Sequence, residues 1–68
     1  MKLKISDMIK QYRCEHQLTQ KQLGIQLQIS PQAISKWELG ISSPDISMFP
    51  RLASLLGCSV DDFFEKST

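Results

Sequence analysis

The stretch LTQKQLGIQLQISPQAISKWELG, residues 18–40, decides the fold of this chain because it contains two helix starts a short distance apart. Thr19 and Gln22 form the pattern of a capping box, in which the side chain of each residue bonds the backbone amide of the other. Ser30 can cap a second helix, and Pro31 suits its first position because the amide that proline lacks has no partner there. The pattern predicts two short helices in tandem.

The apolar residues of this stretch are spaced so that each helix buries one face. They are Leu23, Leu27, Ile29, Ile34 and Trp37. Because Trp37 belongs to this stripe, we expect it to pack in the core and not to stack on a base. Gly40 follows the second helix and is expected to end it.

The outer face of the second helix keeps the polar residues Gln32, Ser35 and Lys36. Glutamine can pair with adenine, lysine with the acceptor edge of guanine and serine with either, which is what a reader of the DNA major groove needs. A solvated helix face is the alternative for such residues when they are seen alone. Together with the two helices and the short turn between them, they predict a DNA-binding helix-turn-helix over residues 19–39.

The segments on either side of this unit predict further helices. Ser6 can cap a first helix that runs to about His16. After a loop at residues 41–44, regular helix is expected to begin close to Pro50, because a proline inside a helix would break its hydrogen bonds. This helix is expected to end at Gly57.

The carboxyl end predicts one more short helix. Ser59 and Asp62 form a second start of the capping-box type. Of Phe63 and Phe64, one is expected in the core and the other as a cap or a dimer contact. With no strand expected, the chain is predicted to be an all-α, compact five-helix domain that spans residues 1–68 as a single unit.

Composition limits the other possibilities. The 68-residue chain is 41% hydrophobic with a net charge of +1, which suits one small domain and argues against nucleic-acid binding by bulk electrostatics alone. It has no apolar run of the roughly 20 residues that a membrane span needs and no signal-peptide core, so we expect a cytoplasmic protein without a membrane partner. Cys14 and Cys58 stand far apart without a companion ligand, and no catalytic set of residues is recognisable. We therefore expect no disulfide, metal, cofactor or enzymatic activity.

A set of residues spread over nearly the whole chain has the pattern of a known family. These residues are Ile9, Tyr12, Arg13, Leu18, Thr19, Gln20, Leu23, Ile29, Ser30, Ile34, Ser35, Trp37, Glu38, Gly40, Pro44, Leu52, Ala53, Leu56, Gly57, Ser59 and Val60. With them the chain resembles the lambda-repressor-like family, also called the XRE or Cro/repressor type of helix-turn-helix. The resemblance implies five helices and binding to a double-stranded DNA operator, expected to be palindromic, as a homodimer. It also implies that residues 31–39 lie in the major groove while the preceding helix crosses the DNA backbone.

The resemblance further implies which residues meet DNA. The positions that read bases fall on Pro31, Gln32, Ser35 and Lys36. The positions near the DNA backbone fall on Thr19, Gln20 and Ser30, and Ser42 and Ser43 in the following loop can bond a further phosphate. Pro31 cannot donate a hydrogen bond, so one base contact of the family is expected to be missing. Arg13 and Glu38 fall on an internal ion pair, which we assign to the architecture and not to DNA reading.

Besides Pro31, three further positions depart from the pattern of the family. Gly24 stands where alanine is usual, which permits close packing but weakens the helix by roughly 1 kcal/mol. Gln28 stands where glycine usually makes a left-handed turn, and we expect backbone strain there on the order of 1 kcal/mol. Leu39 replaces a commonly polar residue, so one phosphate contact is expected to be missing. With Ile25 and Ile41 it is expected to place apolar side chains on the surface.

The leading interpretation is sequence-specific binding of double-stranded DNA by a bacterial or phage transcriptional regulator. The alternative keeps the fold but uses it as a protein-interaction module, such as an antitoxin or antirepressor. The exposed apolar residues and the low net charge favour that alternative, whereas Gln20, Gln32 and Lys36 favour DNA. We expect the chain to be either a complete small regulator or the amino-terminal domain of a longer protein.

Overall fold

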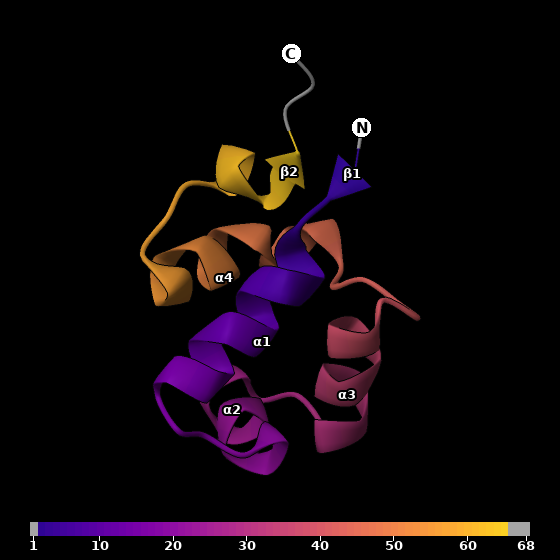
Figure 1. Cartoon of the computed structure of the whole chain (residues 1–68), viewed down its shortest axis with the longest axis vertical. Helices are drawn as coiled ribbons and strands as arrows, with labels where there is room; N and C mark the ends of the chain where they lie inside the picture. The colour runs from indigo at the N-terminus through magenta and orange to yellow at the C-terminus, as the bar shows by residue number, and fades with distance from the viewer. Residues whose placement is uncertain (1, 66–68) are drawn as a thin grey trace.

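The computed structural model describes residues 2–65, in which short helices are stacked around α1 (Figure 1). The elements in chain order are β1 (Lys2–Leu3), α1 (Ile5–Glu15), α2 (Gln20–Leu27), α3 (Pro31–Leu39), the 3-10 helix η1 (Ile46–Met48), α4 (Phe49–Leu56), the 3-10 helix η2 (Val60–Phe63) and β2 (Phe64–Glu65). The two predicted helices of the helix-turn-helix are therefore α2 and α3. They lie at one end of the molecule, and β1 and β2 lie together at the other (Figure 1).

The predicted caps of α2 and α3 are confirmed. The Gln22 amide donates to the Thr19 hydroxyl oxygen at 3.0 Å, and the Thr19 amide donates to the Gln22 side-chain oxygen at 2.8 Å. The Ser30 hydroxyl oxygen accepts from the Ala33 amide at 3.2 Å, with proline in the first turn of the helix. Gly40 ends α3 with φ +74°, a conformation that glycine adopts without a steric penalty.

Two expectations for the ends of the chain are wrong. The last helix is a 3-10 helix, so the described residues contain four α-helices and not five. Strands are also present, because β1 pairs with β2 in an antiparallel ladder that sets Lys2 opposite Glu65 and Leu3 opposite Phe64. Two residues are too few to show the alternating pattern of a strand, and only the meeting of the two chain ends creates the ladder.

The start of α1 also differs from the expectation. The helix begins at Ile5 with Lys4 at the cap position, and Ser6, the predicted cap, lies inside the first turn. The Lys4 amide donates to the Phe63 carbonyl oxygen at 2.6 Å. This long-range bond ties the start of α1 to η2, and no side chain caps the helix. The predicted start of the later helix close to Pro50 is confirmed, since α4 begins at Phe49 directly before Pro50, and the 3-10 helix η1 precedes it.

The core lies where the helices face one another. Among the residues that the structure describes, the buried side chains that form it are Ile5, Ile9, Leu23, Leu27, Ile34, Trp37, Phe49, Leu52, Ala53 and Phe63. Trp37 is 6% exposed, as expected for a core residue. Phe49 and Phe63 meet edge to face with ring centroids 5.5 Å apart, a favoured geometry for two aromatic rings. The buried faces of α2 and α3 hold the helix-turn-helix to the rest of the molecule.

The turn between α2 and α3 has the strained geometry that the resemblance to the family implies. Gln28 adopts φ 59° and ψ 42°, the left-handed conformation that costs a non-glycine residue roughly 1 kcal/mol. Gly24 allows the following chain to come close, since a Cβ atom built on it would lie 2.4 Å from the Ile29 carbonyl oxygen. Glycine at this position therefore accommodates the turn as well as the contact between the helices.

Candidate nucleic-acid interface

The outer face of α3 carries the residues that the resemblance assigns to base reading. Gln32 and Lys36 are exposed, and because they are four residues apart they lie on the same side of the helix. Pro31 is exposed at the first turn, and Ser35 is half-buried. The face can therefore offer the amide of a glutamine, the ammonium group of a lysine and a hydroxyl group to hydrogen-bond acceptors and donors outside the protein.

The residues assigned to backbone contacts are spread around the two helix starts and the loop after α3. Thr19, Ser30, Ser42 and Ser43 are exposed, and Gln20 is half-buried. The hydroxyl oxygens of Thr19 and Ser30 accept backbone hydrogen bonds as caps, which leaves each O–H group to donate elsewhere. The Gln22 amide is taken by the Thr19 cap, whereas the amides of Gln20 and Lys21 have no carbonyl ahead of them in the helix and point out of its amino end.

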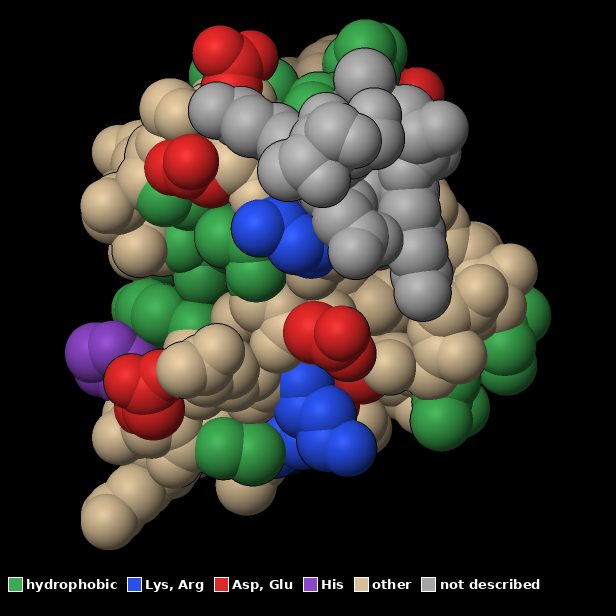
Figure 2. Space-filling view, turned by 45° about the horizontal axis from the view of Figure 1, so that its top comes forward, with side chains coloured by type: hydrophobic (Ala, Val, Ile, Leu, Met, Phe, Trp, Pro, Cys, Tyr) green, Lys and Arg blue, Asp and Glu red, His purple; other side chains and the backbone are tan. Residues whose placement is uncertain are grey.

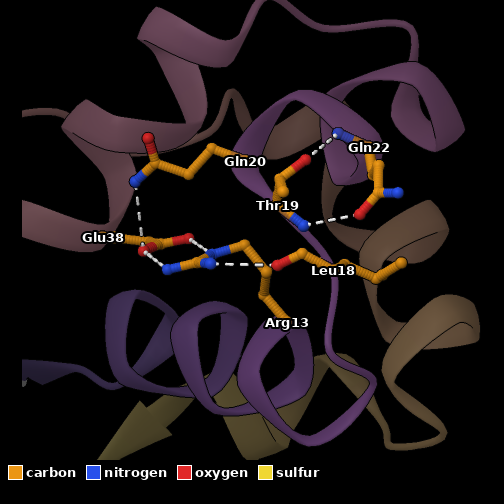
Figure 3. A network of polar contacts seen from close by, with 6 residues as sticks. All are labelled: Arg13, Leu18, Thr19, Gln20, Gln22 and Glu38. Atoms are coloured by element: carbon orange, nitrogen blue, oxygen red, sulfur yellow. Dashed lines mark hydrogen bonds and ion pairs between the residues drawn. The ribbon is translucent and has the colours of Figure 1, made fainter.

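Arg13 and Glu38 are brought together by α1 and α3 (Figure 3). The Arg13 Nε atom donates to Glu38 Oε2 at 2.6 Å, and Nη2 donates to Oε1 at 2.9 Å, which makes the pair bidentate. A third nitrogen of Arg13, Nη1, donates to the Leu18 carbonyl oxygen at 3.0 Å. Only 19% of the Arg13 side chain and 5% of the Glu38 side chain are exposed. The pair thus links α1, the loop before α2, and α3.

Gln20 takes part in the same network, which the sequence did not predict. Its Nε2 atom donates to Glu38 Oε1 at 3.4 Å, near the upper limit for a hydrogen bond (Figure 3). The side chain that the resemblance directs at phosphate is therefore also directed at the end of α3. Glutamine and glutamate occur 18 residues apart in the chain, and no local pattern in the sequence indicates that they meet.

The network lowers the pKa of Glu38 below its ordinary value. The hydrogen bond from Arg13 is the largest cause, burial of the carboxylate opposes it, and the hydrogen bond from Gln20 adds to the lowering. Since the folded state favours the ionised form of the Glu38 carboxyl group, the pair stabilises the protein at pH values above the ordinary glutamate pKa of 4.5. This contribution is lost as the pH falls through the lowered pKa of the folded state.

Glu38→Ala is expected to lower the free energy of unfolding by about 1 to 2 kcal/mol at neutral pH, because Arg13 is left without its partner. The loss is smaller than for a fully buried pair, since 19% of the Arg13 side chain is exposed to solvent. Replacing both residues by Arg13→Met and Glu38→Leu should cost less than either single truncation. Urea denaturation followed at pH 7 and at pH 3 measures both effects. A difference between wild type and Glu38→Ala that stays constant between these pH values would contradict the role of the ionised carboxylate.

Among the described residues, the large apolar side chains that are exposed lie on α2, at the end of α3, in the loop after it and on η1. Ile25, Leu39 and Ile41 are 68%, 71% and 70% exposed, as expected from the sequence. Ile46 is 73% exposed and was not singled out by the sequence, because its place in η1 shows no helical periodicity. On the face shown in Figure 2, lysine and arginine side chains lie singly beside aspartate and glutamate, with hydrophobic groups at both margins. This face therefore has no large patch of one charge.

The sequence also led to expectations about metal sites and membrane spans. Within residues 2–65, no three histidine, cysteine, aspartate or glutamate side chains gather as ligands of a metal ion would. Cys14 is exposed and Cys58 is half-buried, and both are free thiols. None of the helices in the described part of the chain is long and apolar enough to cross a membrane.

Comparisons with known proteins place this arrangement among DNA-binding regulators. The sequence model of the helix-turn-helix family matches residues 9–63, from the middle of α1 to the end of η2. The HTH-type transcriptional activator BcrR of Enterococcus faecalis is 32% identical over 60 residues, which are 88% of this chain but 29% of the activator. The uncharacterized HTH-type transcriptional regulator MJ0272 of Methanocaldococcus jannaschii is also 32% identical over 60 residues, which are 88% of this chain and 91% of that regulator. No solved structure matches the chain significantly.

Proposed function

We propose, from the premise that this chain belongs to the XRE-type helix-turn-helix family, that it binds a specific double-stranded DNA sequence as a regulator of transcription. The observation that carries the proposal is the polar outer face of α3, with Gln32 and Lys36 exposed on one side of a helix whose other side is buried. The Arg13–Glu38 pair joins this helix to α1. We propose that the protein acts in the cytoplasm and has no catalytic role.

In the proposed complex, α3 lies in the major groove and Pro31, Gln32, Ser35 and Lys36 meet base edges. The amino end of α2 faces the DNA backbone, where its first-turn amides and the positive end of the helix dipole attract a phosphate group. Thr19, Gln20 and Ser30 lie at the helix starts and add side-chain donors, and Ser42 and Ser43 add further donors from the loop after α3. Since the amide nitrogen of Gln20 is directed at Glu38, its second N–H group is the one available to phosphate.

The protein is expected to bind DNA as a homodimer on a palindromic operator. One domain of this size covers too little DNA for high affinity, whereas a two-fold pair sets two copies of α3 in successive major grooves about 34 Å apart. Selection from a pool of random duplexes, followed by sequencing, should enrich two inverted half-sites with that spacing. Titration of the selected duplex should then give two protein chains per site. Enrichment of a single half-site with one bound chain would contradict the dimer.

A second candidate function is a protein-interaction module, such as an antitoxin or antirepressor, built on the same fold. The observation that favours it is the exposure of Ile25, Leu39 and Ile41, which are large apolar side chains on α2, at the end of α3 and in the loop after it. The duplex selection separates the two functions. A regulator enriches a defined motif, whereas a protein-interaction module shows only uniform weak binding to DNA that disappears as salt is added.

A further inference from the structure

The turn between α2 and α3 is tight and is held against the preference of its own residues. Gln28 is left-handed, with φ 59°. The Ile29 amide donates back to the Gly24 carbonyl oxygen at 2.8 Å, which closes the end of α2. These contacts lie within the turn itself, so they leave open what keeps a non-glycine residue in this conformation.

Arg51 of α4 reaches this turn from outside the helix-turn-helix. Its Nη2 atom donates to the carbonyl oxygen of Leu27 at 2.8 Å. Leu27 is the last residue of α2, and its carbonyl group has no amide ahead of it in the helix. Among the residues that the structure describes, no other side-chain hydrogen bond joins α4 to α2. The guanidinium group therefore takes the position of a cap supplied by another helix.

The charge of Arg51 suits the same position. The carboxyl end of a helix carries the negative end of the helix dipole and is stabilised by a nearby cation. The last turn of α2 contains no basic residue of its own. Arg51 thus supplies from α4 both the hydrogen-bond donor and the positive charge that α2 lacks at its end.

We propose that Arg51 is a positioning residue of the DNA-reading unit. By holding the Leu27 carbonyl group, it keeps the turn at Gln28 in the left-handed conformation and so sets the direction in which α3 leaves α2. If the turn relaxed, the carbonyl group would rotate away and the hydrogen bond would be lost, so the bond favours the native turn over its alternatives. The effect on DNA rests on the proposed function, whereas the effect on the turn does not.

Amide hydrogen exchange tests the effect on the turn. In Arg51→Ala, the Ile29 amide is expected to exchange about fivefold faster than in wild type, because one hydrogen bond no longer opposes local opening. The amide of Ile9, in the middle of α1, should change little. Lys4→Ala is the matched control, since it removes one exposed positive charge at the other end of the molecule. Equal exchange of the Ile29 amide in Arg51→Ala and Lys4→Ala would overturn the proposal.

Rescue by glycine tests the link between Arg51 and the strained residue. Gln28→Gly removes the penalty of the left-handed conformation, so adding Arg51→Ala to it should speed exchange of the Ile29 amide by less than about twofold. Gln26→Gly is the control, because Gln26 is an exposed residue within α2, where glycine weakens the helix without relieving the turn. If Gln28→Gly fails to reduce the effect of Arg51→Ala, the two residues are not coupled and the proposal is wrong.

Binding to the selected duplex tests the consequence for DNA. Arg51→Ala is expected to bind this duplex about fivefold more weakly than Lys4→Ala, while both variants bind a scrambled duplex alike. Gln28→Gly should restore most of the loss. If wild type selects no duplex, the proposed function and the DNA part of this inference both fall, and the exchange measurements still decide whether Arg51 holds the turn. Equal binding of Arg51→Ala and Lys4→Ala to the selected duplex would overturn the positioning role alone.

Discussion

Phe63→Ala is expected to lower the free energy of unfolding by about 3 to 5 kcal/mol, the usual cost of truncating a buried phenylalanine. Its side chain is 0% exposed and packs edge to face against Phe49. A domain of 68 residues has a total stability of roughly 3 to 10 kcal/mol, so much of the variant should be unfolded at room temperature. Urea denaturation followed by circular dichroism measures the loss.

Phe64→Ala is the matched control for this prediction. Phe64 is half-buried and its ring centroid lies 6.1 Å from that of Phe49, so its truncation removes less buried area and leaves a smaller cavity. We expect a loss of about 1 to 2 kcal/mol for this variant. Equal losses of stability for the two variants would contradict the assignment of Phe63 to the core.

The second large effect concerns the choice of DNA sequence. Gln32→Ala and Lys36→Ala are each expected to relax the preferred motif at one or two base pairs, by about 1 to 3 kcal/mol or five- to 150-fold. The physical reason is that each side chain bonds the edge of one preferred base, whereas a different base at the same position lacks the matching hydrogen-bond group. The selected motif should therefore lose information at distinct positions in the two variants, while affinity for unrelated duplexes changes little.

Variants at the amino end of α2 provide the controls for DNA reading. Gln20→Ala should weaken binding to all duplexes alike and leave the motif unchanged, with little effect on the salt dependence, because the side chain is neutral. Lys21→Ala, an exposed cation in the same turn, should instead reduce the slope of affinity against salt by about one unit. If Gln20→Ala changed the motif while Gln32→Ala and Lys36→Ala left it intact, the assignment of the two helices would be reversed.

Local sequence was enough to predict the helix-turn-helix. The starts at Thr19 and Ser30 and the end at Gly40 follow from bonds between residues at most three positions apart, or from the conformational freedom of one glycine. The left-handed turn at Gln28 was instead expected from the resemblance to the family, in which glycine usually stands at this position. The caps at Thr19 and Ser30 and the end at Gly40 need no contact with the rest of the chain, so the order of residues is sufficient to determine them.

The ion pair and the base-reading residues came from a different kind of inference. Arg13 and Glu38 are 25 residues apart, and it was the resemblance to a family, and not spacing, that predicted their contact. The structure brings them together at 2.6 Å. The proposed roles of Pro31, Gln32, Ser35 and Lys36 in DNA binding likewise come from the resemblance, and the structure adds that Pro31, Gln32 and Lys36 are exposed on α3.

The sequence by itself determined which segments form helices, where the caps of α2 and α3 lie and which face of α3 is polar, because these depend on neighbours within a few residues. Only the tertiary structure decided that the chain ends pair as β1 and β2, that η2 is a 3-10 helix, that Gln20 turns toward Glu38 and that Arg51 reaches the Leu27 carbonyl group. Each of these contacts joins residues brought close by packing of the core. Their free energy depends on the position of a distant partner, which no local pattern in the sequence encodes.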